Sequence, residues 1–414
     1  MDSLTLSPPC SLNNRLFTAI GVLLCLAPAL SVFSGLGLAP LYCIIAAIAM
    51  GLFFYSRTTL LKPLPLEIAI LFLLWALITT AWTISPSIAL MMWLKLALLF
   101  VSAIVVISVL HQANVTWPPY LIEASVPIAL LLILIDRLTH GSLSIFIHHL
   151  APPGKKPYVY DITELDRSAT VIAIFIWPAL LSLIQRGKKQ PALLLWLVTF
   201  AILVTLKSLS AVMGIAAGSI CFILAITFKD KVFSLLIALT LLLIAIIPLV
   251  MLYQEPVKIM TAFPKLPESS EHRLYIWQFV SHKALLHPIR GWGLDSSRVM
   301  PIKPSEMLAK GKSPLPLHPH NSILQLWLEL GIPGVLFFAA FTTAILTTIK
   351  RLDADFRYKT LCICSYAAYL VIGLTAFGIW QEWWMSAGFL AVFALQGLKP
   401  MSTHQSADRS SFRG

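Results

Sequence analysis

Charged side chains are scarce in this chain. Of its 414 residues, 12% are Asp, Glu, Lys or Arg and 58% are hydrophobic, and the mean hydropathy is +0.85. A soluble globular protein carries about a quarter of its residues as charged side chains, so this composition excludes one of this size. Lipid is therefore the expected surrounding of most of the chain.

Cysteine is absent from the long polar segments. The six cysteines lie in apolar runs or near the N-terminus, which argues against a disulfide framework or a thiolate metal site. The Lys and Arg residues behind the net charge of +12 are spread over many short loops, whereas a nucleic-acid-binding face would gather them with aromatic residues. The sequence thus indicates no nucleic-acid partner, no metal and no cofactor.

Apolar runs that could cross a bilayer recur along the chain. A helix of about 20 apolar residues spans the hydrocarbon core. An even number of spans would put both termini on one side of the membrane. The sequence predicts an all-α polytopic membrane protein of about twelve transmembrane helices, at 16–33, 38–55, 66–82, 88–110, 120–138, 168–184, 192–206, 210–228, 232–253, 333–349, 360–380 and 383–398.

Lys and Arg in the short loops predict that both termini are cytoplasmic. Short loops rich in these residues are retained in the cytoplasm. With the N-terminus inside, the inner short loops contain most of them and the outer short loops almost none, Lys207 being the exception. The longer segments 139–167 and 254–320 then face the outer compartment.

One long basic segment lies between the ninth and tenth predicted spans. We divide the chain into the first nine spans (1–253), this segment (254–320), an amphipathic helix with the last three spans (321–398), and a tail (399–414) predicted to be cytoplasmic and disordered. The basic segment contains nine Lys or Arg and five Asp or Glu, a net charge of 9 − 5 = +4, which suits an anionic ligand. Its pattern predicts a helix from 271 to 282 and, further on, a loop rich in Pro, Gly and Ser.

The densest group of chemically active residues is His318-Pro319-His320-Asn321. Asn321 is a candidate N-cap for the amphipathic helix that follows, and His320 would lie at the helix start, where free N–H groups favour an anion. These residues could instead serve only to begin an interfacial helix. A two-histidine metal site is disfavoured, because no cysteine or carboxylate stands nearby at ligand spacing.

The spacing around His320 resembles a family signature. His320-Asn321, nine residues, Gly331, two residues and Gly334 is similar to the histidine signature of the bacterial O-antigen ligases. Their superfamily also includes O-antigen polymerases and protein O-oligosaccharyltransferases.

Three other segments strengthen this resemblance. Residues 271–277 and 287–293 are similar to the arginine helix and the His-Pro, Gly-x-Gly turn of the ligases, and 166–170 resembles the segment that opens their sixth span. Twelve spans with a large outer loop between the ninth and tenth also match the family's layout. One departure is Lys207, which stands where the family usually has arginine.

The resemblance implies a GT-C-like glycosyltransferase of the bacterial inner membrane with its active site at the periplasmic face. The donor would be a glycan linked to undecaprenyl diphosphate, and the acceptor a sugar hydroxyl of the lipid A-core oligosaccharide, with membrane lipids around both. The sequence has no nucleotide-binding loop and no acidic metal cage, so fixed cations would stabilise the leaving diphosphate. Direct attack on this donor would invert the anomeric carbon.

Roles can be carried over to single residues. A neutral histidine can take the proton of the acceptor hydroxyl, and His320 is the candidate base. Arg273 is the first candidate cation for the diphosphate. Each remaining candidate also has a structural interpretation, such as a lipid headgroup contact, a loop-shaping neighbour or a side chain that reaches the interface. The candidates for substrate binding are Arg167, Arg290, Lys207, His318, Asn321, Glu382 and Lys95.

Two other interpretations stay open. The same chemistry with another acceptor would make the protein an O-antigen polymerase or a protein O-oligosaccharyltransferase. A flippase or transporter for the lipid-linked sugar would bind the diphosphate without reaction. Transporters commonly place ionisable residues near the bilayer midplane in two related halves, whereas here most of these residues are predicted at the outer rim and no repeat occurs.

Overall fold

The computed structural model describes residues 10–150, 160–308 and 312–399. Within these ranges the chain consists of helices and irregular connections, with no β-strand, which confirms the all-α class. Apart from Lys399, the tail for which disorder is predicted lies outside the described residues.

Each of the twelve predicted spans falls on a helix of its own. These helices are α1 Cys10–Phe33, α2 Leu38–Tyr55, α3 Leu64–Thr79, α4 Pro86–Gln112, α5 Pro119–Leu138, α7 Asp166–Gln185, α8 Lys189–Thr205, α9 Leu209–Phe228, α10 Lys231–Tyr253, α13 Ser322–Arg351, α14 Phe356–Gly373 and α15 Glu382–Gln396. Seven of the described helices are long and apolar enough to cross a membrane, as expected of a polytopic membrane protein: α1, α2, α4, α7, α9, α10 and α13. The number twelve itself stays a prediction.

Shorter helices occupy the connections. The helix predicted at 271–282 lies within α12, whereas α6 falls in a segment expected to be loop. Buried Asp136 accepts hydrogen bonds from the backbone N–H and the hydroxyl of Ser144, over 2.9 and 2.7 Å, and so fixes the first turn of α6. The connecting helices are α6 Ser142–Leu150, α11 Pro256–Ala262 and α12 Glu268–Leu286, with 3₁₀ turns η1 Gly35–Gly37, η2 Ile162–Leu165, η3 Ser296–Val299 and η4 Pro304–Glu306.

The prediction of a helix over 360–380 is wrong at its end, because α14 stops at Gly373. The Ser322 hydroxyl donates to the Gly373 carbonyl oxygen over 2.9 Å, and the Ile379 N–H donates to Gln325 Oε1 over 2.9 Å. These backbone groups therefore pair with α13, where a continued helix would have paired them with one another. Residues 374–381 form the α14–α15 loop.

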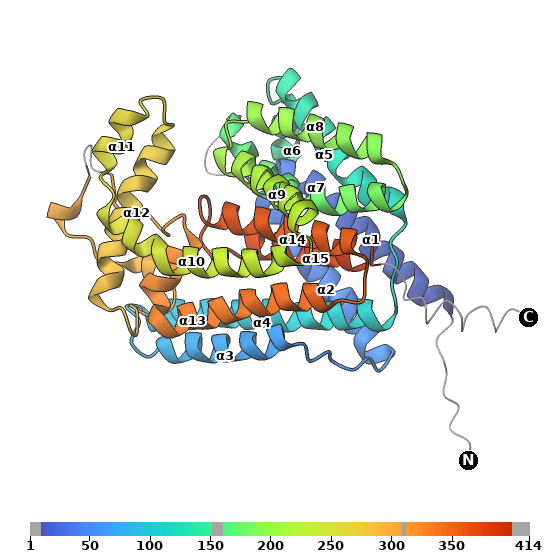
Figure 1. Cartoon of the computed structure of the whole chain (residues 1–414), viewed down its shortest axis with the longest axis horizontal. Helices are drawn as coiled ribbons and strands as arrows, with labels where there is room; N and C mark the ends of the chain where they lie inside the picture. Colours follow the sequence, from blue (N-terminus) through green and yellow to red (C-terminus); the bar gives the residue numbers. More distant parts are fainter. Residues whose placement is uncertain (1–9, 151–159, 309–311, 400–414) are drawn as a thin grey trace, which may run out of the picture.

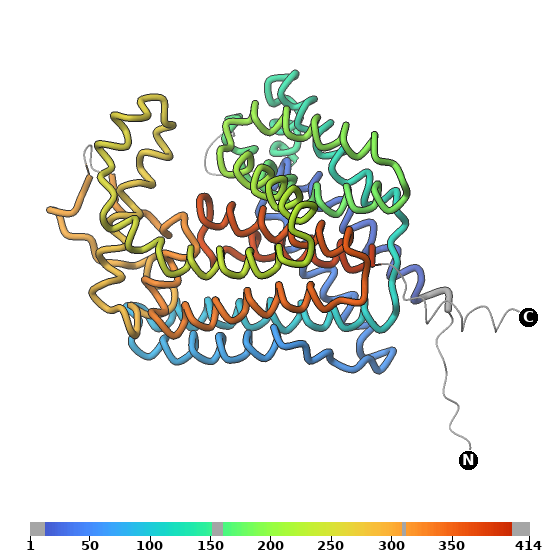
Figure 2. The backbone as a smooth tube through the Cα atoms, in the orientation of Figure 1, coloured from blue at the N-terminus to red at the C-terminus, as the bar shows by residue number. Residues whose placement is uncertain are grey.

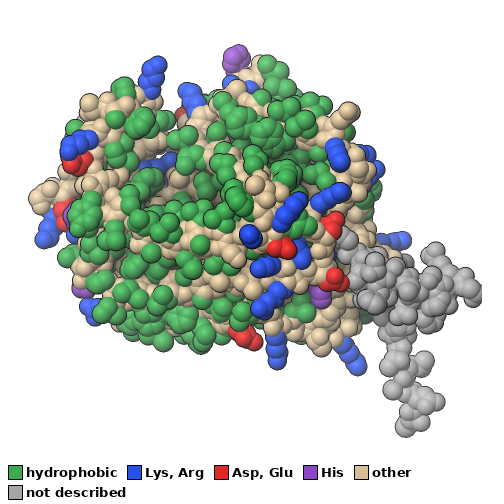
Figure 3. All heavy atoms as spheres, in the orientation of Figure 1, with side chains coloured by type: hydrophobic (Ala, Val, Ile, Leu, Met, Phe, Trp, Pro, Cys, Tyr) green, Lys and Arg blue, Asp and Glu red, His purple; other side chains and the backbone are tan. Residues whose placement is uncertain are grey.

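Apolar side chains form two cores. The first surrounds α7, which packs against α1, α5, α8, α9 and α14. The second comes from α3, α4, α10, α12 and α13. Figure 1 shows α3, α4 and α13 side by side with α11 and α12 beyond their end, and Figure 2 follows the same path. Hydrophobic side chains also cover much of the face in Figure 3, a surface suited to contact with lipid.

Candidate active site at the start of α13

Asn321 begins α13. Its Oδ1 accepts a hydrogen bond from the Leu324 N–H over 3.0 Å, and its side chain is buried, so the predicted N-cap is confirmed. The indole of Trp277, on α12, donates to the Pro319 carbonyl oxygen over 3.0 Å. This bond holds α12 against the residues that precede α13.

His320 lies immediately before that cap. Its backbone is left-handed, with φ of 54°, and its Nδ1 lies 2.5 Å from the carbonyl oxygen of Ala376 in the α14–α15 loop. A carbonyl oxygen can only accept, so Nδ1 donates and carries the proton of the neutral ring. Nε2 then keeps its lone pair and can accept a proton from a substrate.

Two neutral rings stand together here, and we call His318 and His320 the histidine pair. Their centroids are 4.2 Å apart. Burial lowers the pKa of His320, and the positive charge of Arg273 lowers it further, although the bond to Ala376 acts the other way. Burial and the neighbouring charges lower the pKa of His318 to about 3. Gln381 Nε2 donates to His318 Nε2 over 3.3 Å, which again requires an unprotonated ring nitrogen.

Arg273 and Lys207 line a narrow cavity of about 50 Å³ together with Asp166 and Ala376, and we call it the cation cavity. Arg273 comes from α12, Lys207 from the turn between α8 and α9, and Asp166 from the first turn of α7. Burial lowers the pKa of Arg273 while the charge of Asp166 opposes that shift, and a guanidinium stays protonated in any case.

Ala376 connects the cation cavity with the histidine pair. Ala376 lines the cavity, and its carbonyl oxygen accepts the hydrogen bond from His320 Nδ1. The two residues with the most specific predicted roles, Arg273 and His320, therefore converge on one place.

Two predicted arginines lie apart from this cavity. Arg167 is exposed, its guanidinium stands 5.9 Å from the ring centre of Trp383, and its alkyl chain packs against Gly35. Arg290 is exposed in the connection after α12. Neither lines the cavity, so their roles in substrate binding stay predictions.

Lys95 and Glu382 form an ion pair between α4 and α15. Their Nζ and Oε1 atoms are 2.7 Å apart, and the side chains are 50% and 36% exposed. Both residues are candidates from the sequence, but their pairing could not be predicted because they belong to helices far apart along the chain.

Several of these residues lie in a segment that matches a known protein family. Residues 192–339, which include Lys207, Arg273 and His320, match the model of the family described as O-Antigen ligase. Proteins named "Putative polysaccharide ligase" from Rickettsia typhi and Rickettsia felis are 31% and 30% identical over 325 and 323 residues, 77% of this chain and of each relative. One of the same description from Rickettsia conorii is 34% identical over 233 residues, 56% of its length. The chain belongs to the O-antigen ligase family.

In this ligase family member, the glycine of the histidine signature marks a break in α13. Gly331 has φ of 61° and ψ of −163°, and an added Cβ would lie 2.3 Å from the Ile289 carbonyl oxygen, so only glycine fits. The break frees carbonyl groups that find donors elsewhere: the Trp292 N–H donates to Leu328 over 2.8 Å, and the Trp75 indole donates to Leu330 over 2.9 Å.

No sequence pattern pointed to Glu329, which is completely buried beside this break. Its carboxylate accepts from the Asp295 N–H over 2.7 Å, from the Trp380 indole over 2.6 Å and from Gln325 Nε2 over 3.0 Å. Glu329 thereby ties two irregular segments to α13, which a buried acid can do when every donor is matched. An acidic residue within an apolar run was the one available signal.

Arg298 is a second site residue that no sequence pattern singled out. Its Nε lies 3.1 Å from Oδ2 of Asp295, which is 4% exposed. In the described parts of the chain, no group of three or more His, Cys, Asp or Glu residues is arranged to hold a metal ion.

Proposed function

We propose that this O-antigen ligase family member transfers a glycan from undecaprenyl diphosphate to a sugar hydroxyl of the lipid A-core oligosaccharide, at the periplasmic face of the bacterial inner membrane. The observation that supports this most is the convergence of Arg273, Lys207 and His320 through Ala376. It brings fixed cations and a neutral base to one place.

The cation cavity would hold the diphosphate of the donor. Arg273 offers a planar fork of donors to the phosphate oxygens, and Lys207 adds a compact positive charge. As the glycosidic bond breaks, negative charge grows on the diphosphate, and cations fixed in a partly buried site stabilise that charge without reorganisation. The charge of Asp166 acts on Arg273, and the three charged lining residues leave the cavity a net charge of +2 − 1 = +1.

His320 would act as the general base. The acceptor oxygen bonds to the anomeric carbon as its proton passes to Nε2 of His320. The bond between the anomeric carbon and the phosphate oxygen breaks, and its electron pair leaves with the diphosphate. One displacement from the opposite face inverts the configuration, and the proton later passes from His320 to water or to the diphosphate.

The test uses purified protein in detergent with undecaprenyl-diphosphate glycan and rough lipopolysaccharide, with a chelator and without nucleotide. The expected product is glycan-capped lipopolysaccharide. Growth of the glycan on its own carrier without lipopolysaccharide would indicate a polymerase. Donor binding without any product would favour a transporter, and a product that needs added metal would overturn the metal-independent mechanism.

A further inference from the structure

Lys95 is a charged residue inside a long apolar helix. A charge in such a position is expensive and commonly marks a functional site together with its partner. Its partner is Glu382, which comes directly after the α14–α15 loop. Both side chains are partly exposed, with 50% and 36% of their surface free, so the pair is accessible to a ligand.

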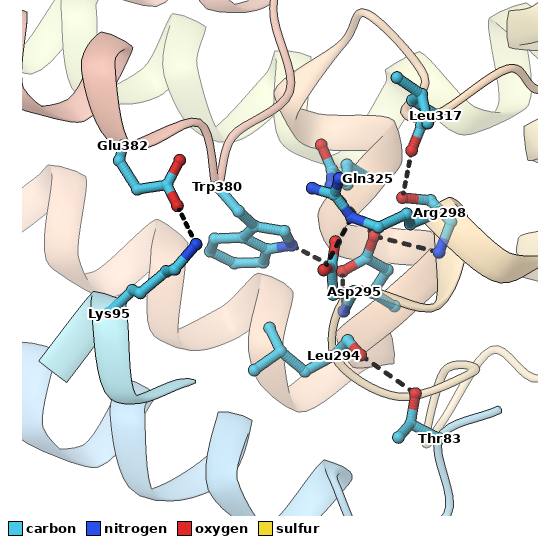
Figure 4. Close-up of polar contacts among 11 residues, drawn as sticks. Thr83, Lys95, Leu294, Asp295, Arg298, Leu317, Gln325, Trp380 and Glu382 are labelled. Carbon is cyan, nitrogen blue, oxygen red and sulfur yellow. Dashed lines mark hydrogen bonds and ion pairs between the residues drawn. The ribbon is translucent and has the colours of Figure 1, made fainter. Parts of the chain in front are cut away.

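A second ion pair stands across the Trp380 indole from the first, as Figure 4 shows. Asp295 accepts from Nε of Arg298 over 3.1 Å, and the Arg298 side chain is 45% exposed. Asp295 is within electrostatic range of Lys95 and Glu382, and Glu382 is within range of Arg298. We call these four residues the paired charge cluster.

The paired charge cluster adjoins the histidine pair on the side of His318. Gln381 precedes Glu382 in the chain and donates to His318 Nε2. The charge of Arg298 acts on His318, and the charge of Arg273 acts on both histidines. The cation cavity, by contrast, adjoins the pair through Ala376 on the side of His320.

The paired charge cluster and the cation cavity differ in net charge. The cluster has two cations and two carboxylates, a net charge of 2 − 2 = 0, whereas the cation cavity has a net charge of +1. A phosphate therefore prefers the cavity. A sugar hydroxyl both donates and accepts hydrogen bonds, so a surface of alternating carboxylates and cations matches a hydroxyl-rich ligand.

We propose that the paired charge cluster binds the acceptor sugar whose hydroxyl attacks the donor. This inference rests on the proposed function, since it divides one transfer between two sides of the histidine pair. Glu382 and Arg298 bind hydroxyls of this sugar, Lys95 orients Glu382, and the bound sugar presents its free hydroxyl to Nε2 of His320.

The central variants are Glu382→Gln and Arg298→Gln, assayed with both substrates varied. Loss of a charged hydrogen-bond partner should raise the acceptor KM about tenfold or more, while the donor KM stays within about twofold. An unchanged donor KM also shows that the variant folds. The matched control is Glu255→Gln, since Glu255 forms an exposed 2.7 Å ion pair with Lys258 on α11.

A charge exchange separates binding from a structural bridge. The double variant Lys95→Glu with Glu382→Lys keeps an ion pair between α4 and α15 but reverses the groups offered to the sugar. The acceptor KM of this double variant should stay above the wild-type value, as in Glu382→Gln. Full recovery would mean that the pair only joins two helices and would overturn the inference.

An acceptor freed of its phosphate groups tests the ligand class. Glu382→Gln should still raise its KM by the same factor. If this sensitivity disappears with the phosphates, or if the donor KM rises as much as the acceptor KM, the assignment to an acceptor sugar is wrong. Wild-type protein that transfers no glycan to lipopolysaccharide would instead refute the proposed function and the inference with it.

Discussion

The two charged regions beside the histidine pair differ in how their charges are matched. In the paired charge cluster every carboxylate has a cation as its partner, at 2.7 and 3.1 Å. In the cation cavity, two cations face one carboxylate. Unmatched positive charge suits a ligand that brings negative charge, whereas matched charge suits a neutral polar ligand. The number of cations in a region is therefore not enough to locate a diphosphate site; their excess over carboxylates matters as well.

The largest effect is expected at the residue between the two regions. His320→Ala should lower the transfer rate by about 10²- to 10⁴-fold, because the acceptor hydroxyl loses its base, while the donor still binds the cation cavity. Single-turnover assays and donor binding measure the two separately. Full activity in the variant would exclude His320 as the base.

The control for this variant is His282→Ala. His282 is exposed on α12, and its loss should change neither rate nor binding.

Removing Arg273, one of the two cations of the cavity, should have the next largest effect. Arg273→Ala should lower kcat by about 10²- to 10³-fold and also weaken donor binding, with the acceptor KM unchanged. Arg273→Lys should recover only part of the loss, because a point charge lacks the planar fork.

Exposed Lys265 provides the control for Arg273, and Lys265→Ala should behave as wild type. A rise in the acceptor KM of Arg273→Ala would contradict the assignment of donor and acceptor to two separate regions.

The pH profile of the transfer rate should also distinguish the cation cavity from the paired charge cluster. A base works only when unprotonated, and the lowered pKa of His320 keeps Nε2 free as the pH falls. The transfer rate should therefore stay constant as the pH falls through about 6.5, the ordinary pKa of histidine, and should decrease only at lower pH.

Charge substitutions should move this profile unequally. Arg273→Gln removes a charge that lowers the pKa of His320, so its rate should begin to fall at a higher pH than in wild type. Arg298→Gln should leave the profile in place, because that charge acts on His318. Equal shifts in both variants would contradict the separation.

The smallest effect concerns the backbone that supports both regions. Gly331→Ala forces a left-handed residue against the Ile289 carbonyl oxygen and should destabilise the protein by about 1–3 kcal/mol, measured as a lower Tm in detergent. Gly51→Ala is the matched control, since a Cβ at Gly51 meets nothing within 4 Å, and in a helix it should stabilise by about 0.5–1 kcal/mol.

The long apolar helices and the residue types of the site could be predicted from local sequence patterns. Apolar runs form helices in lipid whatever their neighbours, since each helix satisfies its own backbone hydrogen bonds, and a cap such as Asn321 acts within a few residues. The end of α14, the bond between Ala376 and His320, and the ion pair between Lys95 and Glu382 could not be predicted in this way. These contacts join residues far apart along the chain, so they depend on how the helices pack, which local pattern does not encode.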